Sequence, residues 1–302
     1  MAIDGILNLD KPKGKTSFDV VALVRRLSGE RRVGHAGTLD PEATGVLPVF
    51  LGQGTRLIEY LAGEAKVYRA EIELGTATDT YDATGKITQR GDISSLTPEQ
   101  VEAAVSTFAG FIDQTPPMYS AVKHKGTPLY RLARAGLEVP RKTRKVEISH
   151  LKIMDWKPPL LTLEVECSRG TYIRSVAHDL GQRLGCGAHL KSLVRLKSGP
   201  FHISDAISIS ELEAAFGQAK WKELLQPIDA AVLHLPAVTV GEEDEKAVMN
   251  GRPLASGIEE GTTAKLRRAY SGDGWLIAIL RYNDEGGHWK PEKVFRKRGE
   301  AA

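Results

Sequence analysis

The feature that most constrains this chain is a twelve-residue stretch, 34–45, that reads GHAGTLDPEATG. Its three glycines disfavour a regular helix or strand and suit a loop that turns sharply or lies close to a ligand. Asp40 stands in the middle of this loop, and Pro41 biases it towards an extended backbone. The apolar run 46–51 can anchor the loop in a core. The stretch therefore predicts a stiffened carboxylate beside a buried strand, although an isolated Asp-Pro more often forms an ordinary turn.

The whole string resembles the signature of the TruB-type pseudouridine synthases, G-H-x-G-T-L-D-P-x-A-T-G, and it matches every specified position. Enzymes of this family form pseudouridine-55 in the T loop of tRNA. The resemblance implies that Asp40 is the catalytic aspartate and that His35 lies at the rim facing the RNA. The family also carries a Lys-Pro pair like that at Lys11, which favours a substrate-binding role for this lysine. A solvated basic turn explains Lys11 equally well.

A second family motif, G-T-Y-I-R, occupies residues 170–174. Thr171 can cap the helix that follows, which places Tyr172 and Arg174 in the first helical turn. An arginine there opposes the helix dipole, which favours acids at this end, and such a local conflict suggests function. The resemblance implies that Arg174 pairs with Asp40, and we assign Tyr172 to substrate binding.

Residues 66–75 alternate between polar and apolar side chains and predict a half-buried strand. This strand carries Tyr68 on its apolar face, where the pattern alone indicates a core tyrosine. The family places a tyrosine at this position against the target uracil, so the resemblance favours a catalytic role. Leu193 aligns with an apolar residue that packs under the flipped base, and ordinary core packing explains it equally well.

Residues 123–145 hold eight basic side chains and a single acid, Glu138, whereas the net charge of the whole chain is only +3. A charge run is usually a solvated face, but a polyanion-binding protein of this composition must concentrate its positive charge locally. The segment therefore predicts a footprint for phosphates. In the family an insertion here is a thumb that grips the RNA stem-loop, and we assign Arg141, Lys142 and Arg144 to substrate binding.

The expected fold class is α+β, with a pseudouridine-synthase-like, mixed but mainly antiparallel sheet and flanking helices. Residues 1–228 would form the catalytic domain, with the RNA-gripping insertion at about 123–145. Residues 265–270 and 275–282 predict two strands joined by a Ser-Gly-Asp-Gly turn. Residues 229–302 would then form a small β-rich, PUA-like accessory domain that binds RNA.

Isomerisation changes no redox state and loses no group, so we expect no cofactor and no metal. The two cysteines lack metal-ligand spacing and favour a reduced, cytoplasmic setting. No apolar run approaches the ~18–20 residues of a membrane span. The expected partner is the T stem-loop of tRNA, and we expect a monomer without an obligatory protein partner.

The implied reaction flips the target base out of the RNA, breaks the N1–C1′ bond and joins C5 to C1′. Asp40 would stabilise positive charge at C1′ or add covalently to the substrate, and Arg174 would keep it ionised. The sequence leaves open attack at C1′, attack at C6, or elimination to a glycal. One rival function is a non-catalytic RNA chaperone, since tRNA folding could also be assisted without Asp40. Another is a glycoside hydrolase that uses Glu42 as a second carboxylate.

Overall fold

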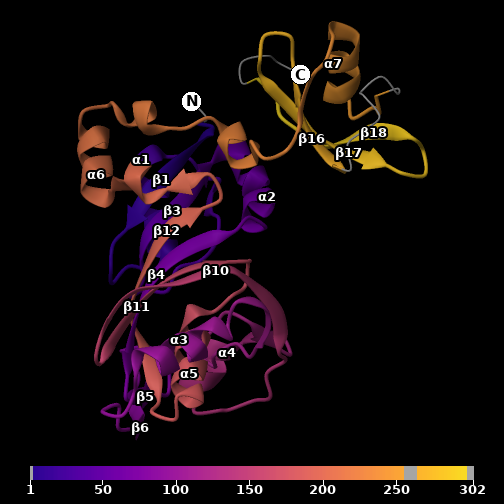
Figure 1. Ribbon diagram of the computed structural model, residues 1–302. Helices are drawn as coiled ribbons and strands as arrows, with labels where there is room; N and C mark the ends of the chain where they lie inside the picture. Colours follow the sequence, from indigo (N-terminus) through magenta and orange to yellow (C-terminus); the bar gives the residue numbers. More distant parts are fainter. Residues whose placement is uncertain (1–2, 255–263, 298–302) are drawn as a thin grey trace.

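A long mixed sheet forms the body of the molecule (Figure 1). The computed structural model describes residues 3–254 and 264–297. In chain order, the strands of this sheet are β1 (Gly5–Lys11), β2 (Val33–His35), β3 (Thr44–Leu51), β4 (Lys66–Leu74), β7 (Gly110–Gln114), β10 (Arg144–Lys157), β11 (Leu160–Cys167), β12 (Ala188–Ser198), β13 (Phe201–His202) and β14 (Ile207–Ser208). Their order in space is β14-β1-β3-β12-β4-β11-β10-β7, with β2 beside β3 and β13 beside β12. Among the described strands of this sheet, only β1–β14 and β3–β12 pair in parallel, which confirms the predicted mixed, mainly antiparallel sheet.

Helices and short hairpins connect these strands. The helices of the body are α1 (Ser17–Ser28), α2 (Ile58–Ala62), α3 (Pro98–Ser106), α4 (Leu129–Arg134), α5 (Ile173–Arg183) and α6 (Ile209–Gly217). The hairpins are β5 (Thr76–Thr78) with β6 (Ile87–Arg90), and β8 (Lys123–His124) with β9 (Thr127–Pro128). Thr16 and Thr97 each form a capping box that starts a helix.

The predicted start of α5 is wrong by one residue. Tyr172, not Thr171, is the N-cap residue, and its side chain forms no capping hydrogen bond. The hydroxyl of Thr171 instead donates to the carbonyl of Ser168 at 2.9 Å, which closes the turn between β11 and the helix. Serine and threonine side chains often bond to nearby backbone in this way, and the tight turn satisfies Thr171 before the helix begins.

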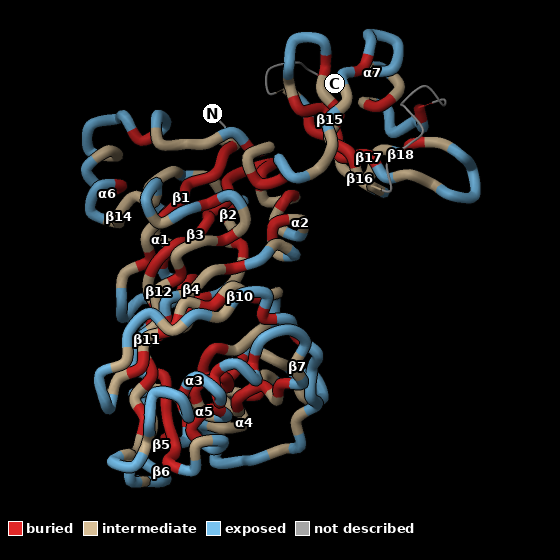
Figure 2. Tube along the Cα trace, in the orientation of Figure 1, coloured by how far each residue is buried: buried red, intermediate tan, exposed pale blue. Residues whose placement is uncertain are grey.

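The apolar residues of β4, β11 and β12 pack against α3 and α5 in one core, which includes Ile72, Leu163 and Val176. A second core lies between β1, β3, α1 and α6 and includes Leu7 and Val49. Figure 2 shows that burial follows these strands through the body. Fully burying such a side chain stabilises the fold by about 1.5–3 kcal/mol, so this alternation of apolar positions determines which face each strand turns inward.

The C-terminal part forms a separate four-stranded sheet in the described residues, with order β15-β16-β17-β18. Its elements are β15 (Ala237–Thr239), α7 (Glu242–Met249), β16 (Leu266–Tyr270), β17 (Leu276–Asn283) and β18 (His288–Val294). The predicted hairpin is confirmed as β16–β17. Residues 255–263 and 298–302 of the predicted module lie outside the described residues.

The short 3-10 helix at Ile228–Val232 packs with Ile6 and Phe50 in a core that also includes Phe295. The side chain of Gln53 donates to the Arg296 carbonyl at 2.9 Å. The C-terminal sheet is therefore fastened to the body. We propose that the domain boundary, predicted at 228/229, lies just beyond this helix. Within the described ranges, no helix has both the length and the apolar character to cross a membrane.

Candidate active site

Two motif residues far apart in the sequence meet in the structure. The Nε of Arg174 lies 2.9 Å from an Oδ of Asp40. Asp40 belongs to the loop between β2 and β3, and Arg174 lies in the first turn of α5. The arginine side chain is only 6% exposed, whereas that of Asp40 is 44% exposed. The carboxylate is therefore held from one side and accessible to a substrate from another.

Arg174 has three further acceptors. Its Nη1 lies 3.4 Å from both Asp82 Oδ2 and the Thr80 carbonyl, and its Nη2 donates to the Tyr119 carbonyl at 2.9 Å. Asp82 stabilises its own polar turn by accepting hydrogen bonds from the N–H and the hydroxyl of Thr84. It also supplies a second carboxylate to the site. No sequence motif identified Asp82, because acids flanked by threonines are common in turns.

The electrostatics of Asp40 depend on this shared cation. Burial raises the pKa of Asp40 above the usual aspartate value, the charge of Arg174 lowers it, and the charge of Asp82 raises it again. The exposed part of the side chain and the close ion pair limit that rise. Arg174 therefore favours the ionised carboxylate that a nucleophilic or charge-stabilising role requires.

Lys11 lies beneath the Asp40 loop and is fully buried. Its ammonium donates to the carbonyls of Pro12, Lys15 and Pro41, at 2.9, 2.7 and 3.2 Å. Burial lowers its pKa to about 8, a shift that the charge of Asp40 opposes. An ammonium has three hydrogens, and all three have protein acceptors. We propose that Lys11 positions the Asp40 loop, and the substrate-binding role expected from sequence stays a prediction.

Arg195 also holds this loop and was not identified from sequence. It is 1% exposed, and it donates to the carbonyls of Val46 and Gly37 at 2.6 and 3.0 Å. Gly45 has a φ of +99°, and a Cβ there would lie 2.3 Å from the Arg195 carbonyl oxygen. Glycine at the end of the signature loop is thus required by close packing against β12. No sequence pattern singled out Arg195, because the same strand also contains Lys191 and Lys197.

Tyr68 and Leu193 lie on one face of neighbouring strands. In the β4–β12 register, Tyr68 is opposite Arg195 and Leu193 is opposite Ala70, and opposite residues share a face. Both side chains pack against the core beneath α5. Burial raises the pKa of Tyr68, whereas the charge of Arg195 and a hydrogen bond from it lower this pKa. The net shift is upward, so the hydroxyl is protonated near neutral pH. The arrangement fits a tyrosine that stacks on a base, and this role stays a prediction.

His35 and Tyr172 are both half-buried. His35 ends β2, and burial lowers its pKa, with the charge of Arg195 as the second cause. The Tyr172 N–H donates to the side-chain oxygen of Gln114 at 2.7 Å, and its carbonyl accepts from the Gln114 amide at 3.0 Å. Gln114 therefore joins the end of β7 to the start of α5, a connection that no sequence motif indicated. The substrate contacts expected for His35 and Tyr172 stay predictions.

The three basic residues assigned to the thumb differ in their surroundings. Arg141 is 17% exposed, donates to the Pro116 carbonyl at 3.0 Å and lies 3.7 Å from Glu138. Lys142 and Arg144 are exposed and form no ion pair within the described residues. Arg141 thus fastens this basic segment to the chain at Pro116, whereas Lys142 and Arg144 are accessible to phosphate.

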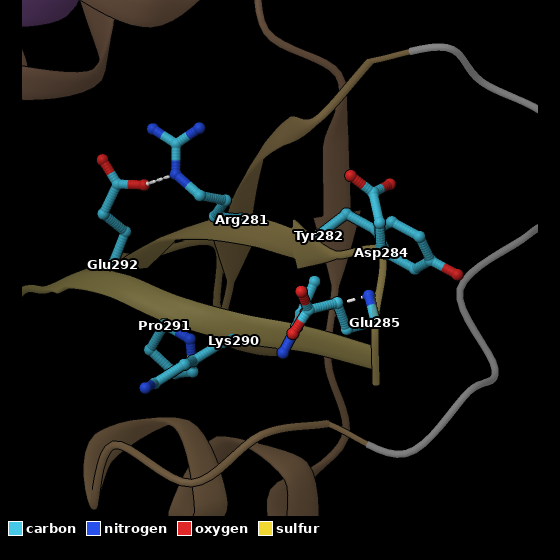
Figure 3. Close-up of a pocket in the computed structure, with 8 residues that line it drawn as sticks. Arg281, Tyr282, Asp284, Glu285, Lys290, Pro291 and Glu292 are labelled. Atoms are coloured by element: carbon cyan, nitrogen blue, oxygen red, sulfur yellow. Dashed lines mark hydrogen bonds and ion pairs between the residues drawn. The ribbon is translucent and has the colours of Figure 1, made fainter. Parts of the chain in front are cut away.

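Other candidate sites do not involve these residues. Among the described residues, no group of three or more histidine, cysteine or acidic side chains is arranged to hold a metal ion. An open hollow of about 650 Å³ lies on the β17–β18 hairpin, with Arg281, Asp284 and Glu292 in its lining (Figure 3). Arg281 and Glu292 form an ion pair there. None of the motif residues lines this hollow, so we place the candidate site at Asp40.

Comparison with known proteins agrees with this geometry. Residues 25–173 match the N-terminal domain model of the TruB family pseudouridylate synthases, and residues 174–233 match the C-terminal domain model of tRNA pseudouridylate synthase B. The chain belongs to the TruB family. It is 48% identical to the tRNA pseudouridine synthase B of Dehalococcoides mccartyi, with 97% of each chain covered. The corresponding protein of Geobacter sulfurreducens is 45% identical, with 92% of this chain and 93% of the relative covered.

A solved structure related to this TruB-family chain has the same fold. A chain in the crystal structure of a Cbf5-Nop10-Gar1 complex superposes with a TM-score of 0.75 at 29% identity. The match covers 97% of this chain and 85% of that one. Family membership and the fold class expected from sequence are therefore both confirmed.

Proposed function

We propose that this protein, a tRNA pseudouridine synthase of the TruB family, acts on the uridine at position 55 in the T loop and uses Asp40 as its catalytic carboxylate. The observation that carries the proposal is the 2.9 Å contact between Asp40, in the signature loop, and the enclosed Arg174. An accessible carboxylate held by a buried guanidinium is suited to nucleophilic or electrostatic work at a sugar carbon.

In the reaction the N1–C1′ bond breaks, the uracil turns, and C5 bonds to C1′. The proton on C5 is lost and N1 gains one, so substrate and product have the same composition. Asp40 would stabilise positive charge at C1′ or add to the substrate. Arg174 would aim the carboxylate through Nε while Asp82 and two carbonyls hold the guanidinium in place. This balanced chemistry requires no cofactor.

Binding would combine base flipping with phosphate contacts. Tyr68 would stack on the target base, Leu193 would support it, and His35 could fill the space that it leaves. Lys142 and Arg144 are exposed and would contact phosphates of the T stem-loop. We propose that the C-terminal sheet is a PUA-like accessory module for RNA.

We propose that the chain acts as a monomer in the cytoplasm, without an obligatory partner, although the solved chain that it resembles stands in a Cbf5-Nop10-Gar1 complex. A non-catalytic RNA chaperone would not need an accessible carboxylate, Asp40, paired with a buried arginine, Arg174. The glycosidase function needs a general acid beside Asp40. Glu42 is instead paired with Lys13 at 3.2 Å, and Asp82, the second carboxylate of the site, is paired with Arg174 at 3.4 Å.

The test is Asp40→Asn, which is nearly isosteric and removes the charge. The variant should bind unmodified tRNA about as well as wild type and form no pseudouridine. The measurement is pseudouridine content after single turnover with excess enzyme, alongside a binding assay, with deamidation checked by mass. Appreciable product from Asp40→Asn would overturn the proposed mechanism, whereas wild-type protein that leaves uridine 55 unchanged would overturn the function.

A further inference from the structure

Tyr81 has no role in the chemistry described so far, yet its backbone is held in an unfavourable conformation. It lies in the turn between β5 and β6 with a φ of +64°. Bulky residues rarely adopt this left-handed region, and residues that do so gather at functional sites. The surrounding contacts must therefore hold Tyr81 in place.

This turn presents two acceptors to Arg174. The Thr80 carbonyl, which precedes Tyr81, and Asp82 Oδ2, which follows it, both lie 3.4 Å from Nη1. A left-handed residue bends the chain sharply, which allows a preceding carbonyl and a following side chain to face one group. The unusual backbone at Tyr81 is thus the geometric condition for this double contact.

The ring of Tyr81 is held by α5 itself. It stacks on the His178 ring with centroids 3.8 Å apart and planes inclined by 10°. His178 lies four residues after Arg174, so the two side chains leave α5 on the same side. The turn is therefore attached to α5 twice, through the contacts of Arg174 and through the stacked rings. On its other side, the Tyr81 carbonyl accepts the Leu190 N–H of β12 at 3.0 Å.

We propose that Tyr81 and His178 form a positioning pair for the catalytic arginine. Their stack presses the strained turn against α5, which keeps Thr80 and Asp82 on Nη1 and so directs Nε at Asp40. Neither ring touches the substrate. The inference rests on the proposed function, because the stacked rings are proposed to help orient Asp40 for pseudouridine formation.

The decisive variant is Tyr81→Asn, since asparagine tolerates a left-handed backbone and lacks the ring. It should fold with unchanged or higher thermal stability and bind tRNA as wild type does. Its single-turnover rate at saturating enzyme should fall on the order of 10–10²-fold, because small misplacements of catalytic groups have effects of this size. Tyr81→Phe keeps the stacking ring and should stay near the wild-type rate.

His178→Ala removes the other ring and should lower the rate by a similar factor. The matched control is His202→Ala, an exposed histidine on β13, which should change nothing. Because both residues act through one stack, the double variant Tyr81→Asn/His178→Ala should be no slower than the slower single variant. If the two rings were only structural, the variants would lose stability, and their reaction rates would not show this non-additive loss.

The outcomes separate the two proposals. Wild-type protein without pseudouridine-forming activity would overturn the proposed function. If wild type is active, three results would overturn the positioning pair alone. Tyr81→Asn could react as fast as wild type, or Tyr81→Phe could react as slowly as Tyr81→Asn. The third result is a rate loss in the double variant that equals the product of the two single losses. If Tyr81→Asn does not fold, His178→Ala decides: a wild-type rate overturns the pair, and a slower rate with unchanged melting temperature supports it.

Discussion

Replacing Arg174 with lysine tests the site most directly, because it keeps the positive charge and removes the planar fork. The guanidinium uses three nitrogens to reach Asp40, Asp82 and two backbone carbonyls. A lysine ammonium is one nitrogen at the end of a flexible stem and cannot occupy these three positions at once. We expect the substituted lysine to stay paired with one of the two carboxylates and to leave the other acceptors of the arginine without a donor.

The structure allows the size of the effect to be worked out. The arginine side chain is 6% exposed, so water cannot readily replace the lost contacts. Each buried acceptor left without a partner costs roughly 1–3 kcal/mol, and at least two acceptors are affected. For two acceptors, Arg174→Lys should therefore destabilise the fold by about 2–6 kcal/mol. A carboxylate misplaced by about 1 Å should slow the reaction by on the order of 10²-fold.

Two measurements check this expectation: single-turnover pseudouridine formation at saturating enzyme, and the free energy of unfolding in denaturant. Arg183→Lys is the matched control, because Arg183 lies on the same helix but is exposed. Binding of tRNA should stay near wild type in both variants. A rate and a stability for Arg174→Lys that equal those of the control would refute the reasoning, since the fork would then contribute nothing beyond its charge.

The remaining predictions concern binding, the base and pH. Reversing Lys142 and Arg144 to glutamate should weaken tRNA binding and lower its salt slope by about 1 for each lost phosphate contact, while saturating rates change little; an unchanged slope in a salt titration would remove these residues from the interface. Tyr68→Leu should abolish turnover, and if the hydroxyl moves a proton, Tyr68→Phe should lose on the order of 10²–10⁴ in rate; wild-type rates in both would make Tyr68 a core residue. Burial raises the pKa of Asp40 and the reaction needs its ionised form, so the single-turnover rate should decline as pH falls through that raised pKa, above the range of an ordinary aspartate. Asp82→Asn should shift this decline to lower pH because it removes a neighbouring negative charge, and an unshifted profile would show that the two carboxylates are not coupled.

Much of the local structure follows from the sequence because its causes are local. The alternation along 66–75 determines which face of β4 is buried, and the capping boxes at Thr16 and Thr97 determine where two helices begin. The two motifs were sufficient to expect that Asp40 and Arg174 meet, but only through resemblance to a family. Spacing alone could not bring them together.

Tertiary structure decided the environment of the site, because burial and partners come from distant segments. Arg195 reaches a carbonyl 149 positions away in the chain, and no pattern near it predicts that contact. Lys11 looks like a surface lysine in sequence, yet its ammonium is surrounded by backbone carbonyls. Asp82 reads as a turn residue until α5 brings Arg174 beside it. The sequence thus determined which side chains were available, whereas the packing of the sheet against α5 determined which of them share charge, because electrostatic coupling depends on separations of a few ångströms in space.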